Sequence, residues 1–289
     1  MNKPLSEREL RTPPLRSIRR HALPVRVTHW INLACIIILL MSGLAIFNGW
    51  PALYWGIRTH FAHPLLAFYA LKAPSGHEVG MTWILGHQFD TTGWFGLSAG
   101  AGGHPVVRGF PAWATLPGPL DLALARRWHF FFAWIFVING VVYGAYALAS
   151  RHFRRDLAPT WRDLRRIGRS VLDHARLRFP KGADARRYNV LQKLSYIVVA
   201  FGMGPLMVAT GLSMSPWLDA ALPWLPAVFG GRQSARTIHF ATAFALLAFI
   251  LIHVIMVLAS GPLNNVRSMI TGRYRIKAWD EKNEQTTDD

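Results

Sequence analysis

Acidic residues and cysteines are scarce in this chain of 289 residues, which has 15 Asp and Glu and a single cysteine, Cys35. One cysteine excludes an internal disulfide framework and any zinc or iron–sulfur site built from cysteines. Charged residues make up only 16% of the chain, against about 25% in soluble domains. The same composition excludes a disordered chain and a secreted disulfide-rich mini-fold.

Apolar and basic residues are abundant instead. Hydrophobic residues make up 52% of the chain, and 32 Lys and Arg give it a net charge of +17. A soluble nucleic-acid-binding protein can be as basic, but its mean hydropathy would not normally reach the +0.21 of this chain. Apolar runs combined with a basic excess are typical of an integral membrane protein whose basic segments bind the cytoplasmic face of the membrane.

Four segments contain the roughly 20 apolar residues that a membrane-crossing helix needs: 27–47, 128–149, 191–214 and 237–259. The third contains Gly204 and Pro205, where we expect a kink that neighbouring helices accommodate. Residues 64–71 are too short to cross and are expected at the interface, and the Gly-rich stretch 79–103 is expected to be a folded loop. The first span is long enough to be a permanent helix rather than a cleaved signal.

The distribution of charge predicts the orientation of these spans. Residues 1–26 carry seven basic and two acidic residues, and residues 151–188 carry twelve basic and four acidic residues. Residues 48–125 carry three of each sign, and residues 215–235 carry one of each. The positive-inside rule therefore places both termini and the 151–188 connection in the cytoplasm.

The expected fold is an all-α integral membrane protein with four transmembrane helices, both termini in the cytoplasm and a long outer loop between the first two helices. The chain then divides into a basic cytoplasmic N-terminus (1–26), a membrane domain (27–259) and a cytoplasmic tail (260–289). The membrane domain includes the outer loop (48–125) and the basic connection (151–188).

Four of the 12 histidines lie in the spans: His29, His129, His239 and His253. A single one could be a polar contact between helices, but ionisable residues in spans are functional by default. His239 and His253 are 14 residues apart, so they share one helix face and lie roughly 21 Å apart along the axis. His29 begins an outward-going helix and shares the cytoplasmic level with His253. His129 begins an inward-going helix and shares the outer level with His239.

Paired imidazoles at two depths are what two six-coordinate b-type haems require, with a four-helix bundle around them. Two alternatives are four unrelated polar contacts and a proton relay, although no Asp or Glu lies in any span. Arg26, Arg127 and Arg236 each precede one of these histidines. They are candidates to bind haem propionates, and the alternative is that they are flanking charges that reach the membrane surface.

Small residues in the spans would permit close approach of a helix or a macrocycle: Ser42, Gly43, Gly140, Gly144, Gly202, Gly204 and Gly211. The sequence Ser42-Gly43-Leu44 is echoed by Thr210-Gly211-Leu212. This echo suggests a duplicated pair of helices.

The motifs R-V-T-H-W at 26–30 and R-R-W-H-F at 126–130, together with the 14-residue spacing on the last span, resemble the bacterial cytochrome b561 family over about residues 23–277. This family includes the b-type cytochrome subunits of nickel–iron hydrogenases, formate dehydrogenases and thiosulfate reductase-type molybdoenzymes. The resemblance implies that the four histidines ligate two haems b, one near each face of the bacterial inner membrane. It also implies electron transfer between a partner's redox centre and the quinone pool.

The family places a quinone near the cytoplasmic haem, around the start of the third helix. The matching residues are 188–196, where Asn189 and Gln192 are candidates to hydrogen-bond a quinone carbonyl, with Lys193 or Tyr196 nearby. The alternative is a helix N-cap at Asn189 followed by interfacial anchors.

The outer loop 48–125 is longer than in compact family members, and a loop of this length needs a role. It holds many aromatic residues and five histidines: His60, His63, His77, His87 and His104. His60-x-x-His63 is a weak metal motif without further ligands. We expect the loop to cover the outer haem and to dock an external redox subunit. The variant with R-R-W-H-F-F-F-A-W resembles cytochromes paired with periplasmic molybdopterin oxidoreductases rather than hydrogenases.

The sequence thus favours a diheme membrane electron carrier that contacts lipid, quinone and a periplasmic partner, with no nucleic acid involved. The alternative is a stand-alone quinone-linked oxidoreductase, for example one acting on superoxide at the outer face. A small diffusing substrate would not need the long loop. A third hypothesis is a transporter whose histidines relay protons.

Overall fold

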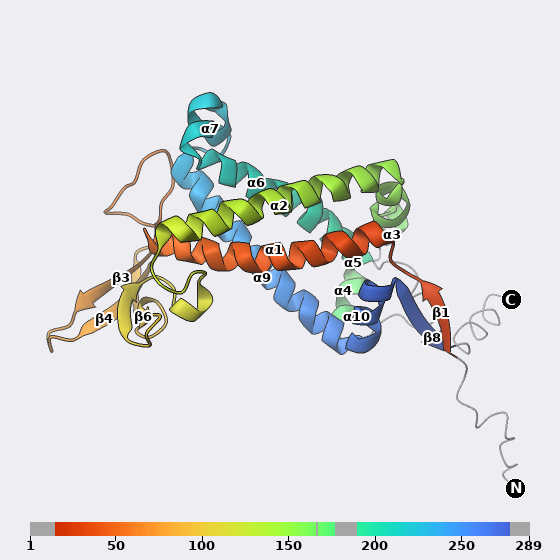
Figure 1. The fold of residues 1–289 in the computed structure, drawn as a ribbon, viewed down its shortest axis with the longest axis horizontal. Helices are drawn as coiled ribbons and strands as arrows, with labels where there is room; N and C mark the ends of the chain where they lie inside the picture. The colour runs from red at the N-terminus through yellow and green to blue at the C-terminus, as the bar shows by residue number, and fades with distance from the viewer. Residues whose placement is uncertain (1–14, 166, 177–189, 278–289) are drawn as a thin grey trace, which may run out of the picture. The chain divides into compact units, whose positions relative to one another are not determined.

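The computed structural model describes residues 15–165, 167–176 and 190–277. Within them, four helical segments are long and apolar enough to cross a membrane: α1 (Leu23–Asn48), α2 (Leu122–Ala149), the segment Val190–Ser213 and α9 (Arg232–Ala259). Helices are the expected form because a lipid core leaves backbone polar groups no partner outside their own segment. The four predicted segments are therefore confirmed as helices long and apolar enough to cross a membrane, as a multi-pass membrane protein requires (Figure 1).

The third span is a composite helix. It consists of α5 (Val190–Tyr196), a π-helical stretch (Ile197–Met203) and α6 (Gly204–Ser213). Pro205 has no backbone N–H, and its ring crowds the carbonyl four residues earlier, that of Phe201. The wider π turn lies over that residue, so the irregularity expected at Gly204 and Pro205 takes the form of a π segment.

The outer loop is not irregular, and the prediction of an all-α protein is wrong for this region. Its first sheet is antiparallel, with strands in the order β2 (Ala52–Leu53), β3 (Leu66–Lys72), β4 (Glu78–Ile84) and β5 (His87–Asp90). Strands β6 (Gly96–Ala99) and β7 (Pro105–Arg108) form a second, two-stranded sheet, followed by a 3-10 turn at Ala112–Ala114. Residues 64–71, expected at the interface, lie largely in β3.

The sheets follow from the spacing of turn residues and apolar residues. Pro74, Ser75 and Gly76 separate two runs rich in aromatic or apolar residues, which is a hairpin signal. Gly96 has a positive φ of 78°, and a Cβ there would collide with the backbone of β3 and β4. Only glycine lets β6 approach these strands so closely.

An aromatic cluster forms the core of the loop. It consists of buried Phe47, Leu53, Phe68 and Phe110, with Phe240 and Phe244 of α9 packed against it. Asn48, the last residue of α1, ties this cluster to the loop. Its side chain donates to the Phe110 carbonyl at 3.1 Å and accepts from the Phe110 N–H at 2.7 Å. The loop is therefore built onto the adjoining ends of α1 and α9.

Buried Arg108 stabilises the end of the same loop. Its guanidinium donates to the Phe110 carbonyl at 2.6 Å, the Gly118 carbonyl at 3.0 Å and the Thr115 hydroxyl at 2.9 Å. These acceptors are neutral, and burial lowers the pKa of the guanidinium below its usual value. An arginine so enclosed fixes the backbone of the loop rather than reaching a ligand.

The chain divides into two compact units. One unit takes in Met1–His29, Tyr143–Val199 and Phe249–Asp289, and the other takes in Trp30–Val142 and Ala200–Ala248. The first unit therefore contains the two basic segments, 1–26 and 151–188, together with the tail 260–289, and the second contains the long outer loop and the short 215–235 loop. Segments predicted on one side of the membrane belong to one unit.

The shorter elements of the described residues fall within these units. The first unit holds β1 (Leu15–Arg19), a π turn (Phe153–Leu157), α3 (Trp161–Arg165), α4 (Ile167–Ala175), α10 (Pro262–Thr271) and β8 (Arg273–Lys277). The second holds α7 (Pro216–Ala221) and α8 (Trp224–Val228). Strands β1 and β8 pair antiparallel, so the two ends of the described chain form one ribbon (Figure 1).

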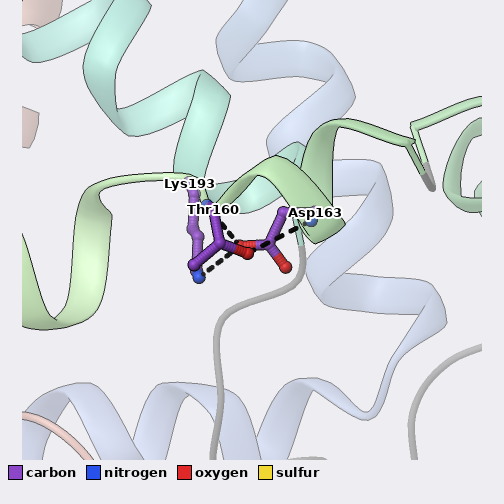
Figure 2. A network of polar contacts seen from close by, with 3 residues as sticks. All are labelled: Thr160, Asp163 and Lys193. Atoms are coloured by element: carbon purple, nitrogen blue, oxygen red, sulfur yellow. Dashed lines mark hydrogen bonds and ion pairs between the residues drawn. The ribbon is translucent and has the colours of Figure 1, made fainter.

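A capping box joins the basic connection to the third span (Figure 2). The Thr160 N–H donates to Oδ2 of Asp163 at 2.9 Å, and the Asp163 N–H donates to the Thr160 hydroxyl at 3.2 Å. Lys193 of α5 donates to the same carboxylate at 2.9 Å. The backbone bond from Thr160, followed by Lys193, lowers the pKa of Asp163, so the carboxylate is charged at neutral pH. The start of α3 is thereby fixed to the start of the third span.

Candidate functional site

The four histidines of the spans lie in two pairs, each within one unit. His129 of α2 faces His239 of α9, with ring centres 6.4 Å apart and planes at 60°. His29 of α1 faces His253 of α9, with ring centres also 6.4 Å apart and planes at 66°. These are the same two pairs of histidines that the predicted orientation of the spans places at the same depth in the membrane.

The distance between the rings fits one metal atom. An imidazole nitrogen binds a metal at about 2.0–2.1 Å and lies roughly 1.2 Å from its ring centre, so two rings on opposite sides of one metal have centres about 6.4 Å apart. Both pairs have this separation. Within the described residues, no group of three or more His, Cys, Asp or Glu could hold a metal ion. A b-type haem would supply four further ligands, so a pair of imidazoles at this distance fits that group.

Ser42 fixes the tautomer of His129. Its hydroxyl lies 2.7 Å from the Ile38 carbonyl oxygen and 3.0 Å from Nδ1 of His129. A hydroxyl has one hydrogen, and the carbonyl can only accept, so Ser42 donates to Ile38 and accepts from Nδ1. Nε2 is left unprotonated, as a metal-binding imidazole requires.

Thr210 does the same for His239. Its hydroxyl lies 2.7 Å from the Leu206 carbonyl oxygen and 3.0 Å from Nδ1 of His239. That Nδ1 is also 3.1 Å from the carbonyl oxygen of Met207, an acceptor that only an N–H can satisfy. The proton is therefore on Nδ1, and Nε2 again carries the lone pair.

Two glycines make room for the same two rings. A Cβ added at Gly43 would lie 3.4 Å from Cε1 of His129, and one added at Gly211 would lie 3.4 Å from Cε1 of His239. At Gly140, Gly144 and Gly202 an added Cβ would meet nothing within 4 Å among the described residues. The small residues of the spans therefore differ: Gly43 and Gly211 contact the histidines, and the other three do not.

The echo between Ser42-Gly43 and Thr210-Gly211 is thus a repeated structure. In each case the hydroxyl bonds the carbonyl four residues earlier and the Nδ1 of the facing histidine, and the glycine that follows contacts Cε1 of that ring. The repeat is visible in the sequence, but the role of its hydroxyls is not. The signal that could have revealed it was a Ser/Thr-Gly pair on the span preceding each outer histidine.

The other pair, His29 and His253, lies among different neighbours. The ring of Phe249 stacks on His253 at 5.9 Å, one turn earlier on α9. Next to His29, buried Thr28 donates to the Pro24 carbonyl at 2.8 Å.

A polar contact that was not predicted from the sequence joins the first two spans. The side-chain amide of Asn139 donates to the side-chain oxygen of Asn32 at 2.8 Å.

The three candidate arginines lie in different environments. Arg26 donates to the Ile270 carbonyl at the end of α10. Arg236 donates to the Trp50 carbonyl, and its guanidinium lies 5.4 Å from the centre of the Phe47 ring. Arg127 is exposed. Arg26 and Arg236 therefore each bind a backbone carbonyl, and each also lies close to a histidine in sequence.

Of the quinone candidates, Asn189 lies outside the described residues. Gln192 is half-buried on α5 and Tyr196 lies one turn further on. The ammonium of Lys193 is bound to Asp163 (Figure 2). The five histidines of the outer loop, with His60 and His63 among them, are all exposed.

An apolar hollow lies on the outer loop. It has a volume of about 410 Å³ and is lined by Ala99, Gly100, Ala101, Gly103, Ala112, Trp113 and Gly118. The side chain of Trp113 is 71% exposed. The hollow lies between the β6–β7 hairpin and the 3-10 turn, on the same loop that packs against Phe240 and Phe244 beside His239.

Comparisons with known proteins agree with this site. A family model described as prokaryotic cytochrome b561 matches residues 20–272, which include all four paired histidines. A curated relative, a putative protein-methionine-sulfoxide reductase subunit YedZ1 of Azospira oryzae, is 26% identical over 233 residues, which are 81% of this chain and 87% of the relative. No solved structure matches the chain.

Proposed function

The chain belongs to the prokaryotic cytochrome b561 family, and from this premise we propose that it is a diheme subunit that carries electrons between a periplasmic redox partner and the membrane quinone pool. Membership brings b-type haem binding and membrane electron transfer with it. The observation that carries the finer proposal is the pair of His–His contacts, each with ring centres 6.4 Å apart.

We assign His29 with His253 to one haem, and His129 with His239 to the other. When bound, a b-type haem supplies a centre that accepts and releases one electron. With two histidines to hold each haem, this chain's residues would favour electron transfer over chemistry on a substrate. Ser42 and Thr210 hold the outer imidazoles in the metal-binding tautomer, and Gly43 and Gly211 give those rings their space.

The two-unit division supports the proposed orientation in the inner membrane. The unit that contains His29 and His253 also contains the basic segments, which belong in the cytoplasm by the positive-inside rule. The unit that contains His129 and His239 contains the outer loop, whose charges balance.

The outer loop has the features of a cover and a docking surface. Its aromatic cluster packs on Phe240 and Phe244, which follow His239 on α9. The 410 Å³ hollow and exposed Trp113 offer an apolar anchor site to a partner. The relative from Azospira oryzae is named as a subunit of a putative protein-methionine-sulfoxide reductase, and we assign this chain a periplasmic molybdopterin oxidoreductase as its partner.

Quinone is assigned to the start of the third span. Gln192 offers an amide donor there, while the Asp163–Lys193 ion pair fixes α5 against α3. Asn189, the second amide candidate, lies outside the described residues. Since Lys193 is neutralised by Asp163, Gln192 is the residue we expect to bond a quinone carbonyl. Arg26, Arg127 and Arg236 retain their assignment to haem propionates.

The first prediction concerns the haem count. Purified protein should show b-type bands in its reduced-minus-oxidised spectrum and contain two haems per chain. His29→Ala or His253→Ala should remove one haem and leave the other, and His129→Ala or His239→Ala should remove the complementary one. The matched control His87→Ala, in the exposed loop, should keep both. Absent b-type bands, or loss of both haems from every well-folded variant, would contradict the assignment.

A second prediction uses the glycines. Gly43→Val and Gly211→Val place methyl groups where an added Cβ already lies 3.4 Å from a histidine ring. Each should displace that ring and reduce the outer haem to well under half occupancy, as measured by a pyridine haemochrome assay. Gly140→Val, with nothing within 4 Å of its Cβ among the described residues, is the control and should retain both haems. Wild-type occupancy in Gly43→Val would refute the role of this contact.

A third prediction concerns quinone. Gln192→Leu removes one hydrogen bond, and we expect the rate of quinol-linked haem reduction to fall roughly tenfold, the equivalent of about 1.4 kcal/mol. Both haem spectra should be unchanged. Gln233→Leu, an amide in the other unit, serves as the control and should keep the wild-type rate. Identical kinetics in the two variants would remove Gln192 from the quinone site.

A fourth prediction tests the partner. The protein, tagged and gently solubilised, should co-purify with a molybdenum-containing protein, and Trp113→Ala should weaken that association at least threefold. Trp161→Ala, equally exposed but on the basic connection, should have no effect. If the chain purified alone and its haems reacted directly with superoxide at an unimpaired rate, the stand-alone oxidoreductase would replace the proposed subunit.

A further inference from the structure

A second cavity lies in the unit that contains the two ends of the described chain. It has a volume of about 240 Å³ and is lined by Arg19, His21, Arg26, Thr271, Gly272 and Arg273. Three of these residues carry a guanidinium, and none of the described residues lining the cavity is acidic. The cavity is therefore strongly cationic, and neither the haem nor the quinone assignment accounts for Arg19 and Arg273.

The cavity is built by the ribbon of β1 and β8 against the end of α10. Gly272 links α10 to β8 with a φ of 77°, and its carbonyl accepts from the Arg20 N–H at 2.8 Å. A Cβ at Gly272 would lie 2.9 Å from the His21 carbonyl oxygen. Asn264 of α10 exchanges two hydrogen bonds with the backbone of Arg275, at 2.8 and 3.0 Å. The walls are thus fixed by backbone contacts.

Two like charges face each other across this ribbon. Arg19 and Arg273 are direct partners in the antiparallel register. Like charges at opposed positions destabilise a strand pair. An anion between them converts this repulsion into two favourable contacts, because a guanidinium matches the oxygens of a phosphate in a bidentate manner.

Arg26, a candidate to bind a haem propionate, also lines the cavity, and its Nη1 donates to the Ile270 carbonyl. The phosphate contacts of the cavity therefore rest on Arg19 and Arg273. Burial and then the neighbouring Arg20 lower the pKa of His21 to about 4, so His21 is neutral at physiological pH and the charge is carried by the arginines.

The helix beside the cavity presents an apolar stripe. Leu263, Val266 and Ile270 of α10 are 88%, 42% and 62% exposed, and their spacing puts them on one helix face. Helix α10 begins three residues after α9 ends, so it lies where the last span leaves the membrane. An exposed apolar stripe with basic residues around it is the pattern of a helix lying in the membrane interface.

We propose that this cavity binds the phosphate of an anionic phospholipid of the cytoplasmic leaflet, while the stripe on α10 lies against its acyl chains. The shared chemistry is a phosphate group, and the adjoining stripe favours a lipid over a soluble anion. Ile270 belongs to the stripe and Thr271, the next residue, lines the cavity, so the two features are contiguous. The proposal uses the cytoplasmic orientation from the proposed function and does not depend on haem or quinone.

The test measures lipid retention by native mass spectrometry and thermal stability in detergent. Delipidated protein should retain phosphatidylglycerol at least threefold more than phosphatidylcholine and should be stabilised by it. The double variant Arg19→Gln/Arg273→Gln should lose this preference. Arg275→Gln removes a charge from the same strand without touching the cavity and should keep the preference. Ile270→Gln should also reduce lipid retention.

Three outcomes would overturn the proposal. The first is equal phosphatidylglycerol retention by the double variant and the wild type. The second is stabilisation by inorganic phosphate alone that matches the lipid and is abolished in the same variant, which identifies a soluble-anion site. The third is a changed haem spectrum in the double variant with unchanged lipid retention, which identifies a propionate site. An intact haem spectrum in that variant also separates lipid loss from misfolding and from failure of the haem assignment.

Discussion

The hydrogen bond that each outer histidine donates from Nδ1 is the interaction on which the site depends. Without an acceptor there, an imidazole in a membrane would exchange tautomers and Nε2 would carry a proton part of the time. Ser42 and Thr210 prevent this because their single hydroxyl hydrogen is already given to a helix carbonyl. The backbone of an ordinary helix thus determines, through one side-chain oxygen, which ring nitrogen carries the proton.

Much of the fold could be predicted because a membrane-crossing helix needs a long apolar segment, which is easily recognised in a sequence. Apolar length alone located the four spans, and the distribution of basic residues put His129 on a level with His239. The outer loop could not be predicted in the same way. Its strands depend on contacts between residues far apart, such as Asn48 with Phe110, and on the close approach that Gly96 permits. The glycine-rich composition predicted a folded loop, but it did not predict that the loop would contain β-strands.

The roles of the small residues in the spans could not be predicted from the sequence either. Gly43, Gly140 and Gly211 are alike in sequence, and each could serve helix packing or cofactor space. Only the facing atoms distinguish them, because the ring of His129 or His239 lies over two of the three. The Ser/Thr-Gly repeat carried this information, but reading it required knowing that a hydroxyl on one helix meets a histidine on another.

The pairing of β1 with β8 has a consequence for how the protein is made. Residues 15–19 are synthesised before the four spans, and residues 273–277 are synthesised after them. Since synthesis proceeds from the N-terminus, the ribbon cannot close until α9 and α10 have been made. Strand β1 therefore stays without its partner β8 until all four spans have been synthesised. Closure of the ribbon is a late event in assembly.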